Sequence, residues 1–349
     1  MTSKKKSNAA TSTSTSTSST NLSAAAAYGA LVVRAVVVVA LAAWAAWSVE
    51  PLLHDRHAVP RHDHQPSPQH IRNAQGLWLH HYAWLPPASS ASLKGVMFYS
   101  HGFGDHCGRY HEFAQLWTNN SFAFFCLDHQ GHGQSEGERV YIEEFDDYIA
   151  DYTQFLDTIL QQHPHLKALP RFLSGTSMGG TIATLVANER SSFFNGVILL
   201  APGIIPDPRS AAPWQIEAAR FFSHYVPKLK VGALDDDNIV ADKDRYRAFM
   251  ADPLAYKGYV TARWGAQMLG AMDKIKSEAA TKTTYPFFVI YGTDDIATNM
   301  AGGEYLIQNA KNSKDKQAKY FDNWKHALLQ EPSRQLLFAD LVEWVKSRS

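Results

Sequence analysis

The chain has 349 residues, of which 45% are hydrophobic and 19% charged, with 33 basic and 33 acidic residues. This composition supports a sizeable buried core and excludes a globally disordered protein. Lys4, Lys5, Lys6 and Arg34 are the only charged residues before Glu50, so the remainder is slightly acidic and lacks the basic excess typical of nucleic-acid-binding proteins.

The first 49 residues form two segments of unusual composition. Residues 1–23 are low in complexity and rich in Ser and Thr, which predicts a disordered tail. Residues 24–49 carry one charge, Arg34, and as a helix they would be about 39 Å long, enough to cross a hydrocarbon core of about 30 Å. We therefore predict a transmembrane or signal-anchor segment and a membrane-associated, single-pass protein. A cleaved targeting segment and a peripheral or buried helix are the alternatives.

Residues 50–70 are rich in Pro and His. The histidine spacing matches no familiar set of metal ligands, and no cysteine accompanies it. We interpret this segment as a solvated linker, with the globular domain over residues 71–349.

Apolar strand segments and helical segments alternate through that domain. The turn over 73–76 predicts a hairpin at its start, and apolar spacing predicts helices over 145–162, 302–310 and 333–346. Uninterrupted apolar strands between helices indicate an α/β fold with a mostly parallel sheet that is covered on both faces. Buried strands are expected at 95–100, 122–127, 197–200, 287–291 and 318–321, with a further short strand ending near Ser174.

The two cysteines, Cys107 and Cys126, fall in a predicted loop and a predicted buried strand. Two thiols do not make a disulfide framework. We interpret Cys126 as a small core hydrophobe.

A Gly-x-Ser-x-Gly pattern spans Gly175 to Gly179, with Ser177 at its centre. An apolar strand precedes the pattern and a helical segment follows it. Glycines at both ends permit the close approach of strand and helix that a sharp turn requires. This context is typical of a nucleophile elbow, which exposes the serine hydroxyl at the end of a sheet.

Acyl transfer by serine also needs a base and an acid that orients the base. His326 follows the last predicted strand, and Asp294 and Asp295 follow the strand before it. The chain order Ser, Asp, His is that of the α/β-hydrolase triad. These residues predict a catalytic triad in which either aspartate is the acid.

Two backbone amides are needed to stabilise the oxyanion. The amide of Met178, directly after the serine, is one candidate, and the amide of Phe103 in the loop 101–104 is the other. His101 in that loop is expected to support its conformation rather than act as a second base.

Several longer strings resemble monoacylglycerol lipases of the α/β-hydrolase fold. Residues 101–110 (HGFGDHCGRY) are similar to the family's HGxGEHSGRY, residues 128–137 match DHxGHGxSxG, and residues 175–180 resemble GHSMGG apart from Thr176. The string Asp252-Pro253-Leu254 resembles one in the family's cap. The similarity covers about residues 71–345.

The resemblance implies Asp295 as the acid of the triad, Ser177 as nucleophile and His326 as base. It implies that Asp105 and Arg109 bind the glycerol end of the substrate. Asp105 stands where the family usually has Glu. Leu329 stands where vertebrate members carry a further polar contact, a His.

An insertion over about residues 203–280 is expected to form a helical cap that lines an acyl tunnel. Its apolar side chains either touch a membrane or simply pack on the core. The run Asp235–Asp237 within it is interpreted as a solvated turn, not a metal site.

We therefore predict a serine ester hydrolase that cleaves monoacylglycerol-like lipids and needs no metal or organic cofactor. A lysophospholipase or general carboxylesterase is the alternative within the fold, and a non-catalytic α/β-hydrolase-like binding protein is the alternative outside enzymes. The expected partners are a lipid ester substrate and a membrane, without nucleic acid, and the oligomeric state is left open.

Overall fold

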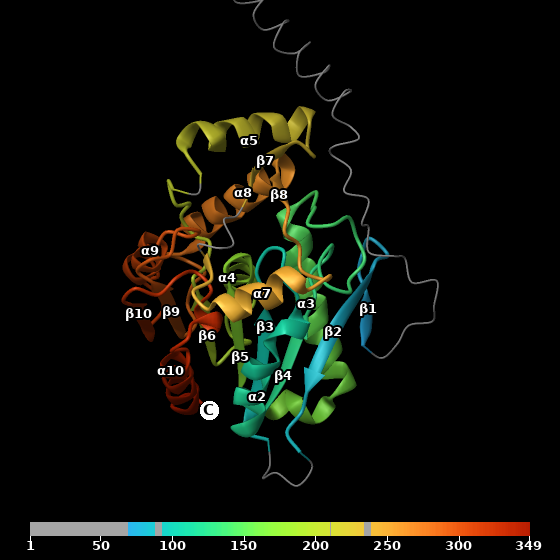
Figure 1. Cartoon of the computed structure of the whole chain (residues 1–349). Coiled ribbons are helices and arrows are strands. Elements are labelled where there is room, and N and C mark those ends of the chain that lie inside the picture. Colours follow the sequence, from blue (N-terminus) through green and yellow to red (C-terminus); the bar gives the residue numbers. More distant parts are fainter. Residues whose placement is uncertain (1–68, 88–92, 210, 234–238) are drawn as a thin grey trace, which may run out of the picture. The chain divides into compact units, whose positions relative to one another are not determined.

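The computed structural model describes residues 69–87, 93–209, 211–233 and 239–349. They contain an eight-stranded sheet with the strand order β1-β2-β4-β3-β5-β6-β9-β10 (Figure 1). Strand β2 pairs antiparallel with β1 and β4, and all other pairings in this sheet are parallel. The strands are β1 (His70–Arg72), β2 (Trp78–Trp84), β3 (Gly95–Ser100), β4 (Phe122–Leu127), β5 (Arg171–Thr176), β6 (Gly196–Leu200), β9 (Phe287–Gly292) and β10 (Lys316–Phe321). The predicted α/β architecture is confirmed.

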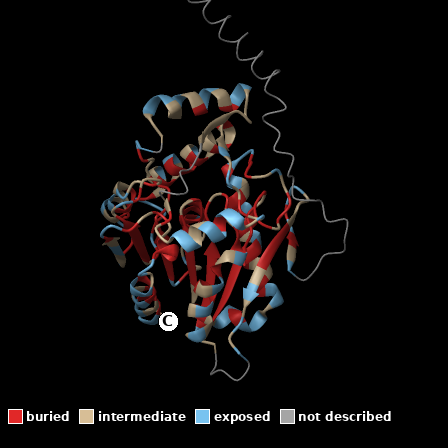
Figure 2. Ribbon diagram, viewed as in Figure 1, coloured by how far each residue is buried: buried red, intermediate tan, exposed pale blue. Residues whose placement is uncertain are grey.

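Helices cover both faces of this sheet, and the central strands are buried (Figure 2). The side chain of Phe172 in β5 contacts Trp344 of α10, whereas Gly175, three residues further along the strand, faces α4. Alternate strand residues point to opposite faces, so α10 and α4 lie on opposite sides. The helices outside the cap are α2 (His111–Asn119), α3 (Phe145–Gln162), α4 (Met178–Glu189), α9 (Ala301–Asn309) and α10 (Gln335–Lys346), with short 3-10 turns η1 (Cys107–Tyr110), η2 (Pro164–Ala168) and η3 (Leu328–Gln330).

The insertion between β6 and β9 forms a cap that is not purely helical. It contains α5 (Pro213–Tyr225), α7 (Lys243–Ala251) and α8 (Ala262–Glu278), together with a two-stranded antiparallel sheet of β7 (Lys230–Ala233) and β8 (Tyr259–Thr261). Helix α8 packs on α4 and α3, and α5 packs on α8 (Figure 1). The cap contains helices as expected, and two short strands pair within it besides.

The predicted single-pass localisation requires correction. Among the helices of the described ranges, none combines the length and apolar character that crossing a bilayer demands. The interpretations of residues 1–23 and 24–49 and of the run Asp235–Asp237 lie outside the described residues, as does most of the predicted linker.

The two cysteines form a disulfide, which the sequence interpretation missed. Cys107 in η1 and Cys126 in β4 are fully buried and joined, with 5.8 Å between their Cα atoms. Cys126 is part of the core as expected, but its sulfur also links η1 covalently to strand β4 of the sheet.

We expect reduction of this disulfide to destabilise the fold. The bond closes a loop with a sequence separation of 19, and cross-links over loops of this size contribute about 3 kcal/mol by limiting the unfolded chain. Urea unfolding with and without dithiothreitol should show a lower midpoint for the reduced protein, and a Cys107→Ser/Cys126→Ala variant should match that midpoint in both conditions. An identical midpoint for oxidised and reduced wild type would contradict this prediction.

Candidate active site

Ser177 lies at a sharp turn between β5 and α4. Its backbone has φ +55° and ψ −120°, a conformation that non-glycine residues rarely adopt and that is found mainly at functional sites. The Ser177 amide donates to the Leu200 carbonyl at 3.0 Å, and the Ser177 carbonyl accepts from Gly180 at 2.9 Å. These bonds hold the strained turn, with its side chain at the carboxyl end of the sheet.

Glycines on both sides of Ser177 allow this turn to form. A Cβ atom on Gly175 would lie 2.2 Å from the Gly179 carbonyl oxygen, and one on Gly179 would lie 2.1 Å from the Ser100 carbonyl oxygen. Both contacts are with backbone atoms, which cannot move aside by a change of side-chain rotamer. The two glycines therefore bring β5, α4 and β3 together at the serine.

His326 and Asp295 form a buried pair in the loops after β10 and β9. His326 Nδ1 lies 2.8 Å from Asp295 Oδ2. The other carboxylate oxygen, Oδ1, accepts from the amides of Ala297 at 2.8 Å and Thr298 at 3.0 Å. Thr298 Oγ1 also donates to Oδ2 at 2.8 Å. This carboxylate is held in one orientation, with one oxygen on the backbone and the other on the histidine.

The environment keeps Asp295 ionised. Burial by itself would raise the pKa of Asp295, but the charge of His326 and the hydrogen bonds from His326 and Thr298 outweigh it and hold the pKa below its usual value. Asp294 is exposed, and its amide donates to the Trp324 carbonyl. Of the two aspartates that the chain order left open, the structure brings Asp295 to the histidine.

The two predicted oxyanion residues lie beside the serine. Met178 is the first residue of α4, and amides in the first turn of a helix have no partner within it. Phe103 lies in the loop after β3 and, with Ser177, lines two pockets. The adjacent His101 is fully buried and accepts from the His129 amide at 3.1 Å through Nε2, while its Nδ1 donates to the Gly102 carbonyl at 2.8 Å. Burial lowers the pKa of His101 to about 4, so a neutral imidazole supports this loop.

The first pocket has a polar end, made by Asp105 and Arg109. Their side chains form an ion pair at 2.9 Å, and the Tyr110 hydroxyl donates to Asp105 Oδ2 at 2.7 Å. Burial would raise the pKa of Asp105, but Arg109 and the Tyr110 hydrogen bond hold it below its usual value. The remaining wall is largely apolar, and the pocket encloses about 90 Å³. Its other lining residues include Thr176, Ser177, Ile239, Val240, Phe249, His326, Ala327 and Leu329.

The second pocket is apolar and runs beneath the cap. It encloses about 170 Å³ between the core and helices α5 and α8. Ser177 and His326 line this pocket as well as the first. The two pockets therefore meet at the candidate nucleophile and base. The cap residues of its lining include Ile216, Ala219, Trp264, Met268, Leu269 and Met272.

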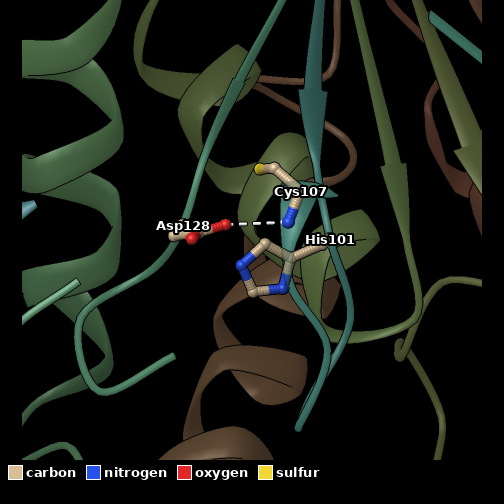
Figure 3. Close-up of side chains that lie close together, drawn as sticks. All are labelled: His101, Cys107 and Asp128. Atoms are coloured by element: carbon tan, nitrogen blue, oxygen red, sulfur yellow. Dashed lines mark hydrogen bonds between the residues drawn. The ribbon is translucent and has the colours of Figure 1, made fainter. Parts of the chain in front are cut away.

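A second cluster of chemically active side chains lies close to the loop after β3 (Figure 3). One ligand atom each of His101, Cys107 and Asp128 lies within 4.8 Å of the others. The donor atoms are already engaged: the cysteine sulfur in the disulfide, both imidazole nitrogens in hydrogen bonds, and Asp128 as acceptor from the amides of Cys107 at 2.7 Å and Gln134 at 2.9 Å. Burial raises the pKa of Asp128 to about 6. These contacts stabilise the loop after β3, and the cluster does not fit a metal ion.

Sequence reasoning missed three residues that the structure adds to the site. Thr298 binds the acid of the pair, and Phe249 places its ring 4.6 Å from the Arg109 guanidinium. Tyr99, fully buried in β3, forms a 2.8 Å hydrogen bond with Thr176. The position of Thr298, three residues after Asp295, was the only indication in the sequence that it contacts the acid. Phe249 and Tyr99 look in the sequence like ordinary core residues.

Comparisons with known proteins agree with this architecture. The family model described as serine aminopeptidase, S33 matches residues 91–333. The monoglyceride lipase of Mus musculus is 34% identical over 282 residues, covering 80% of this chain and 90% of the relative. The monoacylglycerol lipase of Mycolicibacterium smegmatis is 27% identical over 272 residues, covering 78% and 94%.

Solved structures show the same fold. A soluble variant of monoglyceride lipase from Saccharomyces cerevisiae, in complex with a substrate analog, has a TM-score of 0.72 at 21% identity, covering 83% of this chain and 98% of that one. The monoacylglycerol lipase of Paleococcus ferrophilus has a TM-score of 0.67 at 24% identity, covering 78% and 99%. The resemblance seen in the sequence motifs is confirmed: the chain belongs to the serine aminopeptidase, S33 family of α/β-hydrolases and is similar to monoglyceride lipases over most of its length.

Proposed function

We propose that this chain is a serine hydrolase that cleaves monoacylglycerol to a fatty acid and glycerol through an acyl-enzyme. The observation that carries the proposal is that Ser177 and His326 line both pockets. An ester bond at Ser177 would place its acyl chain in the apolar pocket and its alcohol in the pocket that ends at Asp105 and Arg109. Single-chain lipid esters of a small polyol have the same two parts, an apolar acyl chain and a small polar alcohol.

In the mechanism, His326 Nε2 takes the hydroxyl proton as Ser177 Oγ attacks the ester carbonyl. The amides of Phe103 and Met178 stabilise the oxyanion. As the ester C–O bond breaks, His326 returns the proton to the leaving glycerol. Water, deprotonated by His326, then attacks the acyl-enzyme. As the bond between the acyl carbon and Ser177 Oγ breaks, His326 returns the proton to Oγ and the fatty acid is released. Asp295 keeps Nδ1 protonated, so that Nε2 is free to act as base.

The first pocket supports glycerol over a phosphate-bearing head group. The carboxylate of Asp105 is ionised and already paired with Arg109, so a phosphate would meet a negative charge without a free cation from this pair. The same pocket is about half the volume of the acyl pocket. Both observations disfavour the lysophospholipase alternative. The buried His326–Asp295 pair, beside pockets that Ser177 also lines, disfavours a non-catalytic binding protein.

The test uses purified full-length protein with monooleoylglycerol and lysophosphatidylcholine as substrates. We expect fatty acid release from monooleoylglycerol to be the faster reaction, and Ser177→Ala to abolish both. Equal slow release by wild type and Ser177→Ala would refute the mechanism. Faster hydrolysis of lysophosphatidylcholine would refute the substrate assignment.

We further propose that α5 contacts the lipid surface that presents the substrate. One face of this helix lines the acyl pocket through Ile216 and Ala219. Trp214, Phe221 and Tyr225 are 72%, 50% and 73% exposed, and their spacing of seven and four residues places them along one side of the helix. Aromatic rings of this kind are favoured at membrane–water interfaces.

Replacing Trp214 and Tyr225 with alanine should weaken binding to phosphatidylcholine vesicles containing monooleoylglycerol by about 100-fold or more, because each buried aromatic side chain contributes about 1.5–3 kcal/mol. Leu336→Ala is the matched control, since Leu336 is 62% exposed on α10, outside the cap. Vesicle co-sedimentation measures the effect. Equal losses in the double variant and the control would contradict a specific contact by α5.

A further inference from the structure

Thr176 lies beside the candidate nucleophile at the first pocket. It is the last residue of β5, directly before Ser177, and its side chain lines the first pocket beside the serine. Only 8% of its surface is exposed. Its hydroxyl is therefore a polar group close to the alcohol side of any ester bound at Ser177.

Two buried tyrosines lie between Thr176 and the polar end of that pocket. Thr176 Oγ1 lies 2.8 Å from the Tyr99 hydroxyl. The rings of Tyr99 and Tyr110 lie 4.5 Å apart between centroids, and Tyr110 donates to Asp105 Oδ2 at 2.7 Å. Tyr99 is fully buried, so Tyr99 holds the Thr176 hydroxyl in place beside the pocket.

Thr176 Oγ1 can accept a further hydrogen bond whichever of the two hydroxyls donates to the other. If Thr176 donates to Tyr99, both lone pairs of Oγ1 remain, and if Tyr99 donates to Thr176, one lone pair remains. Oγ1 is therefore available as an acceptor for a group in the pocket.

We infer that Thr176 Oγ1 is a specificity-determining acceptor that binds a free hydroxyl of the leaving alcohol, with its side chain positioned by the hydrogen bond to Tyr99. The inference rests on the proposed function and names the residue that selects polyol esters over simple alkyl esters. Away from its polar end, the pocket is also lined by the apolar residues Val240, Ala327 and Leu329. A hydroxyl of the alcohol that lies against these residues needs Thr176 Oγ1 as its partner, because a buried hydroxyl without a partner is unfavourable.

The test compares two esters of one fatty acid, monooleoylglycerol and ethyl oleate, which differ in the hydroxyls of the alcohol. Thr176→Val keeps the branched shape at the strand end and removes the hydroxyl, and Thr176→Ser keeps the hydroxyl. We expect the ratio of kcat/KM for monooleoylglycerol to that for ethyl oleate to fall about tenfold in Thr176→Val and to be retained in Thr176→Ser.

Each outcome separates the inference from the proposed function. If wild type prefers monooleoylglycerol and Thr176→Val keeps that ratio, this inference is wrong and the proposed function stands. The inference is also wrong if Thr176→Ser loses the ratio as fully as Thr176→Val, since the shape of the side chain would then be what matters. If wild type shows no preference for monooleoylglycerol, the proposed function fails and the inference with it.

Discussion

Replacing Asp295 by asparagine is expected to lower kcat for monooleoylglycerol by about 10⁴-fold while the protein remains folded. The Oδ1 position accepts from two backbone amides, so the asparagine must place its carbonyl oxygen there. Its NH₂ group then faces His326 Nδ1, which is forced to accept. The imidazole proton moves to Nε2, and the histidine can no longer take the proton of Ser177.

Asp294→Asn is the matched control, because it makes the same change one residue away on an exposed side chain. We expect its kcat to stay within about twofold of wild type, as is usual for surface substitutions. Steady-state kinetics of both variants, with circular dichroism to establish folding, check this prediction. A large loss in Asp294→Asn with a small loss in Asp295→Asn would reverse the assignment of the acid.

Gly179→Ala is expected to destabilise the protein by about 3 kcal/mol, the upper end of the usual cost of overpacking. The new Cβ would lie 2.1 Å from the Ser100 carbonyl oxygen and 2.4 Å from that of His101, so α4 would have to move away from β3. Because α4 begins at Met178, that movement would also displace the serine turn. Activity should therefore fall together with the free energy of unfolding.

Gly270→Ala provides the opposite case. Gly270 lies within α8, and a Cβ there would have no heavy atom within 4 Å, so the variant should be more stable than wild type by up to about 1 kcal/mol. Urea unfolding of the two variants measures the contrast. A stability loss of similar size in both would show that the glycine at 179 is not required by close packing.

The sheet could be predicted from the sequence because its strands are buried on both faces. Runs such as residues 95–100 and 122–127 are largely apolar, and a polar residue, His101 or Asp128, follows each. The order of Ser177, Asp295 and His326 along the chain then located the candidate triad, although the choice of Asp295 over Asp294 needed the family resemblance. The cap strands gave no such signal, because Lys230–Ala233 and Tyr259–Thr261 are four and three residues long and carry no clear alternation.

The contacts that shape the alcohol pocket could not be predicted for a different reason. Tyr99 lies inside an apolar run, and nothing in its neighbours shows that its hydroxyl meets Thr176. The disulfide joins residues 19 apart in sequence, and only the packing of η1 on β4 brings the two sulfurs together. Such pairings depend on which side chains face each other across elements, which apolar periodicity does not specify.

The central claim is that Ser177 is the nucleophile that forms the acyl-enzyme. Labelling the full-length protein with a fluorophosphonate and mapping the adduct by peptide mass spectrometry tests it most directly. We predict a single adduct on the peptide that contains Ser177, with monooleoylglycerol hydrolysis lost in proportion to labelling and no adduct in Ser177→Ala. An adduct on another residue, or hydrolysis that survives complete labelling of Ser177, would contradict the account.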